Sequence, residues 1–193
     1  MLSEKLVKLM KNRRNIKPIF FSEERIADQI VHQMLEVANW APTHGHTEPW
    51  RFVVFTDGAL ERFGEFQASL YKEKTPVENF QQKKYDKLAA VPPMASHCIA
   101  IVCKKGPKEK IPMLEEIAAT SCAVQNILLV AAAENIGVHW ASGGVSYWNE
   151  TKEYLGYELQ DQVLGLLYLG YPKIEWPEGK RLSNINQKLD WRT

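Results

Sequence analysis

The sequence predicts an α+β fold, in which helices and a few short strands are mixed along the chain. Apolar residues recur at helical spacing in several segments, and short runs of β-branched and aromatic residues separate these segments. The two kinds of segment do not alternate as in a regular series of parallel strands and crossover helices. The chain has no internal repeat and no linker rich in Gly, Ser and Pro, so we expect residues 1–193 to form one domain.

Two helices are predicted before the first strand. Apolar side chains at helical spacing indicate the first helix over residues 2–12, and Pro18 follows it. Ser22 is a good N-cap residue, so we predict the second helix over residues 23–40, ending before Pro42.

The rest of the chain contains the strands and the longest helix. Apolar runs rich in β-branched or aromatic residues predict strands over 51–56, 99–103, 138–140 and 163–169. Helices are predicted after Gly58 to about Tyr71, over 113–135 and over 146–154. The helix over 113–135 is apolar or small on nearly every side, so it needs cover all round. The domain's own sheet and a second subunit would together provide that cover.

Charge and hydropathy narrow the class of protein. Of the 193 residues, 45% are hydrophobic and 24% are charged, as expected for a globular domain. The 24 basic and 23 acidic side chains nearly cancel, so we expect no general surface for nucleic acid. The longest apolar run, Ile127 to Ala133, is shorter than the ~20 residues of a membrane-spanning helix, and the N-terminus lacks a signal-peptide core. We expect a soluble, cytoplasmic protein with no membrane partner.

The cysteines predict neither a disulfide framework nor a zinc ribbon. Cys98, Cys103 and Cys122 cannot all pair within one chain, and none forms a C-x-x-C unit. Cys98 and Cys103 lie in and beside an apolar run, where free cysteine is usually a small buried hydrophobe rather than a reactive thiol.

The basic cluster Arg13-Arg14-Asn15-Ile16-Lys17 is the first candidate for chemistry. Cations at the end of a helix commonly interact with its negative C-terminus and nothing else, and the cluster alone favours that explanation. The alternative is a site for a phosphate and a heterocycle. Guanidinium groups bind phosphate oxygens in pairs, and Asn offers a ring amide both a donor and an acceptor.

The second candidate is the loop over residues 40–50, WAPTHGHTEPW. Its His44 and His46 lack the further ligands that a zinc site requires, so we expect no metal. Its prolines and tryptophans predict a stiff wall, which suits an aromatic ligand and ordinary core packing about equally.

Two further clusters lie in the C-terminal half. In His139-Trp140-Ala141-Ser142-Gly143-Gly144 the glycines allow the backbone to approach a ligand closely, with an ordinary turn as the alternative. Gly179-Lys180-Arg181-Leu182 is either part of a basic site or a solvated turn. The chain lacks the motifs of esterases, P-loop proteins, zincins and Rossmann proteins. Cation and backbone clusters without a catalytic dyad are expected where a cofactor supplies the reactive atom.

The order and spacing of these clusters resemble the nitroreductase family of flavin enzymes, and most closely its small members. The 13–17 cluster is similar to the family's Arg-Arg-Ser-Ile/Val-Arg/Lys opening. Ala41-Pro42-Thr43-His44 and Glu48-Pro49-Trp50-Arg51-Phe52 are similar to its Ala-Pro-Ser…Gln-Pro-Trp-x-Phe loop. The long helix before Gly137 and the segment Leu167-Tyr168-Leu169-Gly170-Tyr171-Pro172 extend the likeness over nearly the whole chain.

The resemblance implies a fold, a cofactor and an activity. The fold is a central mixed or antiparallel sheet flanked by helices, with a long central helix, in an intertwined homodimer that holds FMN between its subunits. The activity is hydride transfer from NADH or NADPH through flavin N5, in ping-pong order, to a small flat electron-poor acceptor such as a nitroaromatic, a quinone or an enone. No residue identifies a preference between NADH and NADPH.

The resemblance also implies cofactor-binding roles. The FMN phosphate, ribityl chain and pyrimidine edge would be held by Arg13, Arg14 and Asn15, with Lys180 and Arg181 reaching the phosphate. One edge of the flavin ring would be lined by Trp140, Ala141, Ser142 and Gly143. Trp40 and His44 of the second subunit would border the ring.

Lys17 and His44 are the residues that could influence the chemistry itself. The reduced flavin gains negative charge near N1 and O2, and the Lys17 cation would stabilise that state. His44 would form a wall rather than donate a proton. Residues 75–88 are polar and are predicted to form an exposed helix or a mobile loop. The longer segment 71–95, which contains them, would cap the pocket. Its large side chains are expected to pack rather than to meet substrate: Tyr71, Phe80, Tyr85 and Met94.

Two alternatives stay open at this point. One is a different flavin reaction, such as reductive dehalogenation or flavin breakdown. The other is a flavin-binding protein with a sensing or storage role. Asn15 stands where the family usually has Ser, and Glu48 where it usually has Gln, so the acceptor cannot be inferred from the resemblance.

Overall fold

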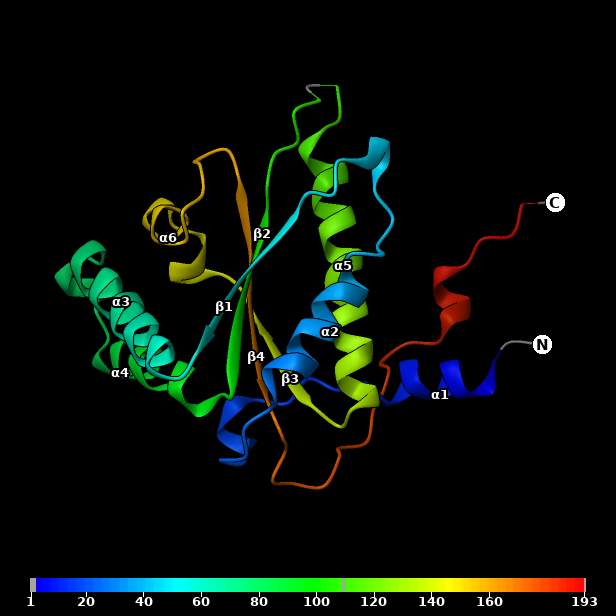
Figure 1. The fold of residues 1–193 in the computed structure, drawn as a ribbon, viewed down its shortest axis with the longest axis horizontal. Coiled ribbons are helices and arrows are strands. Elements are labelled where there is room, and N and C mark those ends of the chain that lie inside the picture. The colour runs from blue at the N-terminus through cyan, green and yellow to red at the C-terminus, as the bar shows by residue number, and fades with distance from the viewer. Residues whose placement is uncertain (1–2, 109, 193) are drawn as a thin grey trace.

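A four-stranded antiparallel sheet forms the centre of the protein, in a computed structural model that describes residues 3–108 and 110–192. The strand order is β1-β2-β4-β3, with β2 and β4 in the middle (Figure 1). The bounds of the strands are β1 Trp50–Thr56, β2 His97–Cys103, β3 Gly137–Ala141 and β4 Gln162–Gly170. All four predicted strands are present, and each extends by one or two residues beyond the prediction. Every residue of β2 is buried, as expected for a central strand.

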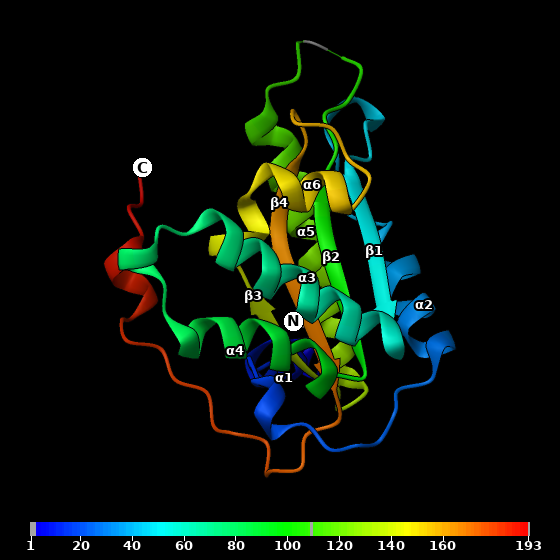
Figure 2. The ribbon, with the colours of Figure 1, turned by 90° about the vertical axis from the view of Figure 1, so that its left-hand side faces the viewer.

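Helices cover both faces of the sheet. One face carries α2 (Asp28–Ala38) and α5 (Met113–Ala133), and the other carries α3 (Gly58–Lys74), α4 (Gln82–Ala90) and α6 (Asn149–Tyr154) (Figures 1 and 2). The alternation of side chains along each strand divides the core accordingly. Ile99 and Ile101 belong to the core on the α2–α5 face, whereas Ala100 and Val102 belong to the core on the α3 face.

The long helix α5 packs one side against the sheet. Ala123, Val124 and Ile127 are fully buried there, while Leu114 and Cys122 are exposed. By length and composition alone α5 could cross a membrane, with a mean hydropathy of 1.5, but its burial against the sheet accounts for that composition. The cover by a second subunit that was expected for its outer side stays a prediction.

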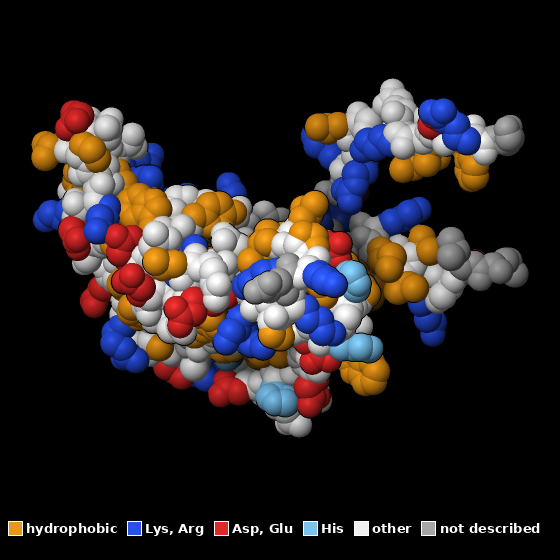
Figure 3. Space-filling view, turned by 90° about the horizontal axis from the view of Figure 1, so that it is seen from above, with side chains coloured by type: hydrophobic (Ala, Val, Ile, Leu, Met, Phe, Trp, Pro, Cys, Tyr) orange, Lys and Arg blue, Asp and Glu red, His pale blue; other side chains and the backbone are white. Residues whose placement is uncertain are grey.

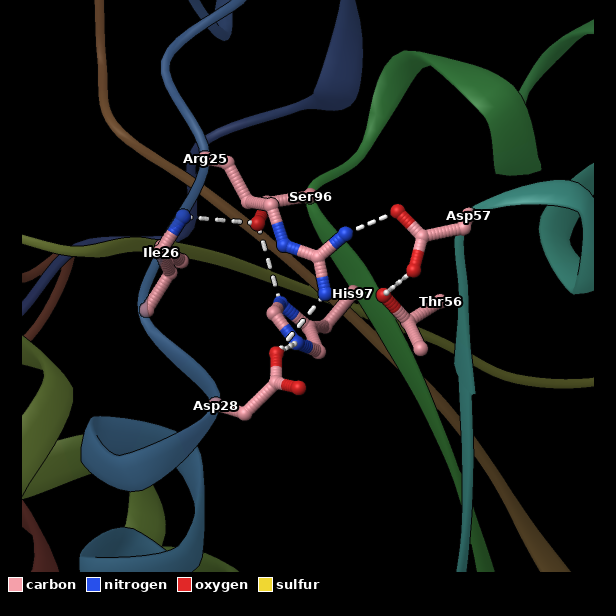
Figure 4. Close-up of polar contacts among 7 residues, drawn as sticks. All are labelled: Arg25, Ile26, Asp28, Thr56, Asp57, Ser96 and His97. Atoms are coloured by element: carbon pink, nitrogen blue, oxygen red, sulfur yellow. Dashed lines mark hydrogen bonds and ion pairs between the residues drawn. The ribbon is translucent and has the colours of Figure 1, made fainter.

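Helix α2 begins later than predicted, and Ser22 is not its N-cap. The Ser22 hydroxyl accepts a hydrogen bond from the Glu24 N–H at 3.3 Å, and the extended residue Ala27 precedes the helix. The reason is tertiary: the Ile26 N–H donates to Ser96 Oγ at 2.9 Å (Figure 4). These bonds hold residues 22–27 in an extended conformation across the end of the sheet, so local capping preference is overridden.

A chain of polar contacts secures this segment to the sheet (Figure 4). Arg25 forms ion pairs with Asp28, the first residue of α2, and with Asp57, the residue that precedes α3. His97 Nε2 lies 3.1 Å from Asp28 Oδ1, and its Nδ1 lies 2.9 Å from Ser96 Oγ. His97 is therefore a buried histidine whose two ring nitrogens both have partners.

Burial of His97 predicts that acid destabilises the fold. Desolvation lowers the pKa of His97 below its ordinary value of 6.5, and contact with Asp28 offsets only part of that change. The unfolded chain takes up this proton at a higher pH than the folded chain. The contribution of His97 to the free energy of unfolding is thus present above pH 6.5 and is lost as the pH falls towards the lowered pKa.

Replacing His97 should flatten this pH dependence. We expect H97N to be less stable at neutral pH but to lose less of its remaining stability between about pH 7 and 5, measured by urea unfolding. H32N, which changes an exposed histidine of α2, is the control and should keep the wild-type slope. A wild-type slope in H97N would contradict the assignment.

The segment 71–95 and the cysteines behave mainly as predicted. Tyr71 stacks on Phe80, and the Tyr85 ring is tilted against Phe80 in the same small core, so packing is confirmed for these three, while Met94 is 43% exposed. The segment is ordered as the end of α3, a short 3-10 turn and α4. Burial raises the pKa of the Cys98 and Cys103 thiols, which confirms their role as inert core residues. The helix expected over 146–154 begins only at Asn149, after a 3-10 turn.

Both ends of the described chain form arms that leave the body of the protein (Figures 1 and 3). The first is α1 (Glu4–Asn12), capped by the Ser3 side chain, which buries none of its residues; Leu2 of the predicted helix lies outside the described residues. The second is the C-terminal arm, residues 173–192. Large apolar side chains are exposed on both arms: Leu6, Met10, Leu182, Ile185, Leu189 and Trp191.

Candidate functional site

Two of the sequence clusters meet at the free edge of β3. The Ile16 N–H donates to the Val138 carbonyl oxygen at 3.0 Å, so residues 15–16 run beside the strand. Asn15 Oδ1 accepts from the Trp140 N–H at 3.3 Å and lies 3.0 Å from His139 Nδ1. Residues more than 120 positions apart in sequence therefore form one local structure, which the sequence suggested only through the family resemblance.

Arginine side chains gather beside this edge. Arg13 is half-buried and lines a cavity of about 300 Å³ with Asn15, Val138 and Trp140 on the α5 side of the sheet. Burial, and then the nearby charges of Arg181 and Arg14, lower the pKa of Arg13. Positive charges held this close repel one another, and a bound anion would relieve the repulsion. The arrangement suits a phosphate group.

Arg14 is engaged differently from the predicted phosphate fork. Its Nε donates to the Pro177 carbonyl oxygen at 2.7 Å, and its Nη1 donates to the carbonyls of Lys11 and Arg13 at 2.6 and 2.8 Å. The guanidinium packs against Gly179, where a Cβ atom would lie 2.3 Å from Arg14 Cζ. Arg14 therefore fastens the C-terminal arm to the end of α1, and its contact with a phosphate stays a prediction. Lys180 is exposed beside this junction.

A second cavity, of about 310 Å³, lies on the α3 side of the same edge. Its wall at the end of β3 contains Ala141, Ser142 and Gly143, and its outer wall is α4. Gly143 has a φ of +88°, and no heavy atom lies within 4 Å of the place a Cβ would occupy. The backbone here can therefore approach a flat ligand closely, as the glycines predicted.

Gln67 of α3 is a buried donor without a partner in this cavity. Its side chain is 2% exposed, and among the described residues its Nε2 makes no hydrogen bond, although the Tyr168 hydroxyl lies nearby. Burial raises the pKa of Tyr168, so this phenol stays neutral. An unpartnered buried amide is costly unless a ligand accepts its hydrogen bond. A ring carbonyl of a flavin fits this requirement.

Sequence reasoning missed Gln67. The signal available was a lone amide on the apolar face of α3, between Phe63 and Leu70, where a polar side chain needs a partner.

Trp140 does not share a wall with the residues that follow it. Successive side chains of a strand point to opposite faces, so the Trp140 ring lies on the α5 side and Ala141 on the α3 side. The Trp140 Nε1 donates to the Leu164 carbonyl oxygen at 3.2 Å. The strand period therefore places the Trp140 side chain in the first cavity and Ala141, Ser142 and Gly143 in the second, and their expected shared role at one edge of the flavin ring stays a prediction.

Lys17 and His139 lie near the second cavity. His139 is half-buried and lines it, while Lys17 is exposed close by. Burial first, and then the charges of Lys17 and Lys87, lower the pKa of His139. Lys17 thus acts electrostatically on the wall of the cavity that a flavin ring fits.

Trp40 and His44 lie elsewhere in the chain. Trp40 is 87% exposed at the end of α2, and His44 Nδ1 lies 2.5 Å from the Glu115 carboxylate at the start of α5. Among the described residues they line neither cavity. A second subunit would have to bring them to the site, as the resemblance implies. No group of three His, Cys, Asp or Glu side chains in the described ranges could hold a metal ion.

A basic anion site and a ring-sized cavity with an unpaired donor flank one sheet edge, and together they fit a phosphate-bearing ring cofactor. The class is thus an α+β protein with a site for such a cofactor. The family model "Nitroreductase family" matches residues 10–171, and the chain belongs to the nitroreductase family.

Similar proteins agree with this assignment. YfhC of Bacillus subtilis (strain 168), named as a candidate NAD(P)H nitroreductase, is 30% identical over 184 residues, which cover 94% of this chain and 91% of that protein. A nitroreductase-like family protein from Bacillus cereus has a TM-score of 0.85 at 24% identity, covering 100% of this chain and 98% of that one. The FMN-dependent nitroreductase NfnB from Mycobacterium smegmatis, solved in complex with NADPH, has a TM-score of 0.75 at 15% identity, covering both chains fully.

Proposed function

We propose that this protein is an FMN-dependent NAD(P)H oxidoreductase that reduces small, flat, electron-poor acceptors such as nitroaromatics, quinones or enones. The observation that carries the proposal is Gln67, whose buried Nε2 has no hydrogen-bond partner among the described residues and which lines a cavity at the same sheet edge as the Arg13 and Arg181 guanidinium groups. One cofactor with a ring at one end and a phosphate at the other satisfies both requirements. NfnB, which shares the fold, is FMN-dependent and was solved with NADPH.

The residues of this chain bind and orient the cofactor. Arg13 and Arg181 would neutralise the phosphate, Asn15 would hold the edge of β3 beside the ribityl chain, and Gln67 would donate to a ring carbonyl. The backbone from Ala141 to Gly143 approaches the ring. When bound, FMN supplies the atom N5, which accepts a hydride from NADH or NADPH and passes the electrons on.

Lys17 and α4 have two further roles near the ring, one electrostatic and one as a cover. The Lys17 ammonium stabilises negative charge that develops at the pyrimidine end and so raises the reduction potential. Helix α4 covers the cavity and restricts water access. Donor and acceptor would have to reach the same ring under this cover, which favours ping-pong order.

We further propose that the working unit is a homodimer of one-domain chains in the cytoplasm. Trp40 and His44 of one chain would border the ring held by the other, with His44 as a wall because Glu115 already engages its Nδ1. The two arms, with their exposed apolar side chains, provide surfaces for this pairing (Figure 3). Neither nucleic acid nor membrane has a part in this function.

The purified protein should be yellow and should bleach with a nicotinamide donor. We expect about one FMN per chain, rapid anaerobic loss of absorbance near the flavin maximum with NADH or NADPH, and recovery on adding a nitroaromatic or quinone. Bound flavin that neither donor bleaches would favour a sensing or storage role. Bleaching with halogenated aromatics as the only oxidants would favour dehalogenation. A protein that stays colourless after addition of FMN would refute the proposal.

A further inference from the structure

The cavity over β3 has a positively charged lining. Lys84 and Lys87 of α4 line it, and no described residue in the lining is Asp or Glu. The chain as a whole has nearly equal numbers of basic and acidic side chains, 24 against 23. The charge of this lining is therefore local and does not reflect a generally basic surface.

The two lysines act from one side of the cavity. They are separated by three positions on α4, so their side chains lie on the same helix face. Lys84 Nζ lies 4.5 Å from the centre of the Tyr71 ring, a cation–π contact that restrains it. Lys87 is close enough to His139 to lower its pKa. The acid between them, Asp86, accepts a hydrogen bond from Gln82 at 2.7 Å and does not line the cavity.

The position of these lysines separates them from the cofactor anchors. The groups suited to FMN lie on the other walls: Arg13 beyond the strand edge, Gln67 on α3 and the backbone at Gly143. The lysines belong to the helix that covers the cavity from outside, and both remain exposed. An ammonium on a flexible stem suits a ligand that enters and leaves.

We propose that this cavity selects flat acceptors that carry a negatively charged group, a carboxylate in the simplest case, and that Lys84 and Lys87 determine this specificity. The proposal deepens the function proposed above and rests on it. Two exposed cations beside a bound carboxylate favour the anion over a neutral analogue by about tenfold at low salt. Salt should reduce this preference because both side chains are in contact with solvent.

The test compares 4-nitrobenzoate with its neutral analogue 4-nitrobenzamide on the flavin-loaded protein. Dissociation constants come from perturbation of the flavin absorbance and from ligand-observed NMR, and kcat/KM comes from NAD(P)H oxidation. We expect wild type to prefer the carboxylate about tenfold at low salt and K84Q/K87Q to show a ratio near one. K83Q is the matched control, since Lys83 is exposed on the same helix but does not line the cavity; it should keep the wild-type ratio.

Each other result has a definite meaning. Equal binding of the two compounds by wild type overturns the inference. So does a K84Q/K87Q variant that loses FMN affinity but keeps the ratio, because the lysines would then hold the cofactor. A preference for the carboxylate in NMR binding, without bleaching by either nicotinamide, supports charge selection and rejects the proposed function. If the protein reduces both compounds with NADH or NADPH and shows no preference between them, the proposed function is supported and charge selection is rejected.

Discussion

The R13A variant should bind FMN about 10- to 100-fold more weakly than wild type, because charge-assisted hydrogen bonds to a phosphate each contribute roughly 1.5–3 kcal/mol. Arg13 is half-buried, and among the described residues that line the cavity at the strand edge it carries the only cation, with Arg181 close to it. Fluorescence titration of the flavin gives the dissociation constant. Riboflavin, which lacks the phosphate, should bind R13A and wild type equally.

R14A is the matched comparison for this effect. The Arg14 guanidinium is engaged by the carbonyls of Lys11, Arg13 and Pro177, so its loss should lower the melting temperature and free the C-terminal arm. In R13A the melting temperature of the flavin-free protein should change little. If R13A weakens riboflavin and FMN equally, the phosphate lies elsewhere. If R14A instead produces the FMN-specific loss, the roles of the two arginines are exchanged.

The G165A variant should lose about 3 kcal/mol or more of its free energy of unfolding, through steric overlap and an unfavourable backbone angle. Gly165 has a φ of +129°, and a Cβ there would lie 2.4 Å from the Ala141 carbonyl oxygen and 2.8 Å from Trp140 Nε1. The residue sits where the pairing of β4 with β2 shifts register, between Ile101 and Val102. A central strand cannot move aside without disturbing both neighbours. For a chain of this size the melting temperature should fall by about 6–12 °C.

The G156A variant separates the cost of steric overlap from the cost of the backbone angle. Gly156 has a φ of +80°, but no heavy atom lies within 4 Å of its added Cβ. Only the backbone cost of about 1 kcal/mol should remain. Thermal and urea unfolding measure both variants. Equal losses in G165A and G156A would show that β3 can yield at Ala141, and the steric part of the predicted loss would be wrong.

The strands and the long helix follow from sequence because their signals are local and strong. Runs such as Ile99 to Cys103 are apolar and β-branched, and no competing pattern overlaps them. The start of α2 fails for the opposite reason. Ser22 has a good capping side chain, but the hydrogen bond from Ile26 to Ser96, a partner 70 positions away, decides the conformation. A single sequence contains no sign of that pairing.

The candidate site also contains some features that could be predicted from the sequence and others that could not. Arg13 and Asn15 lie beside Trp140 of β3, whereas the Trp140 side chain faces away from Ala141 because of the strand period, which could have been applied in advance. Gln67 was missed because its significance depends on burial. Trp40 and His44 stay predictions, since a second chain is needed to bring them to the cofactor.

The two terminal arms have a consequence for how the protein behaves when diluted. Under the proposed pairing, part of each cofactor's surroundings comes from the neighbouring chain, and the apolar side chains of the arms are covered only when chains associate. Mass action then ties cofactor retention to protein concentration. Nanomolar samples should shed flavin and lose thermal stability together, whereas concentrated samples keep both, and excess FMN should draw separated chains back together.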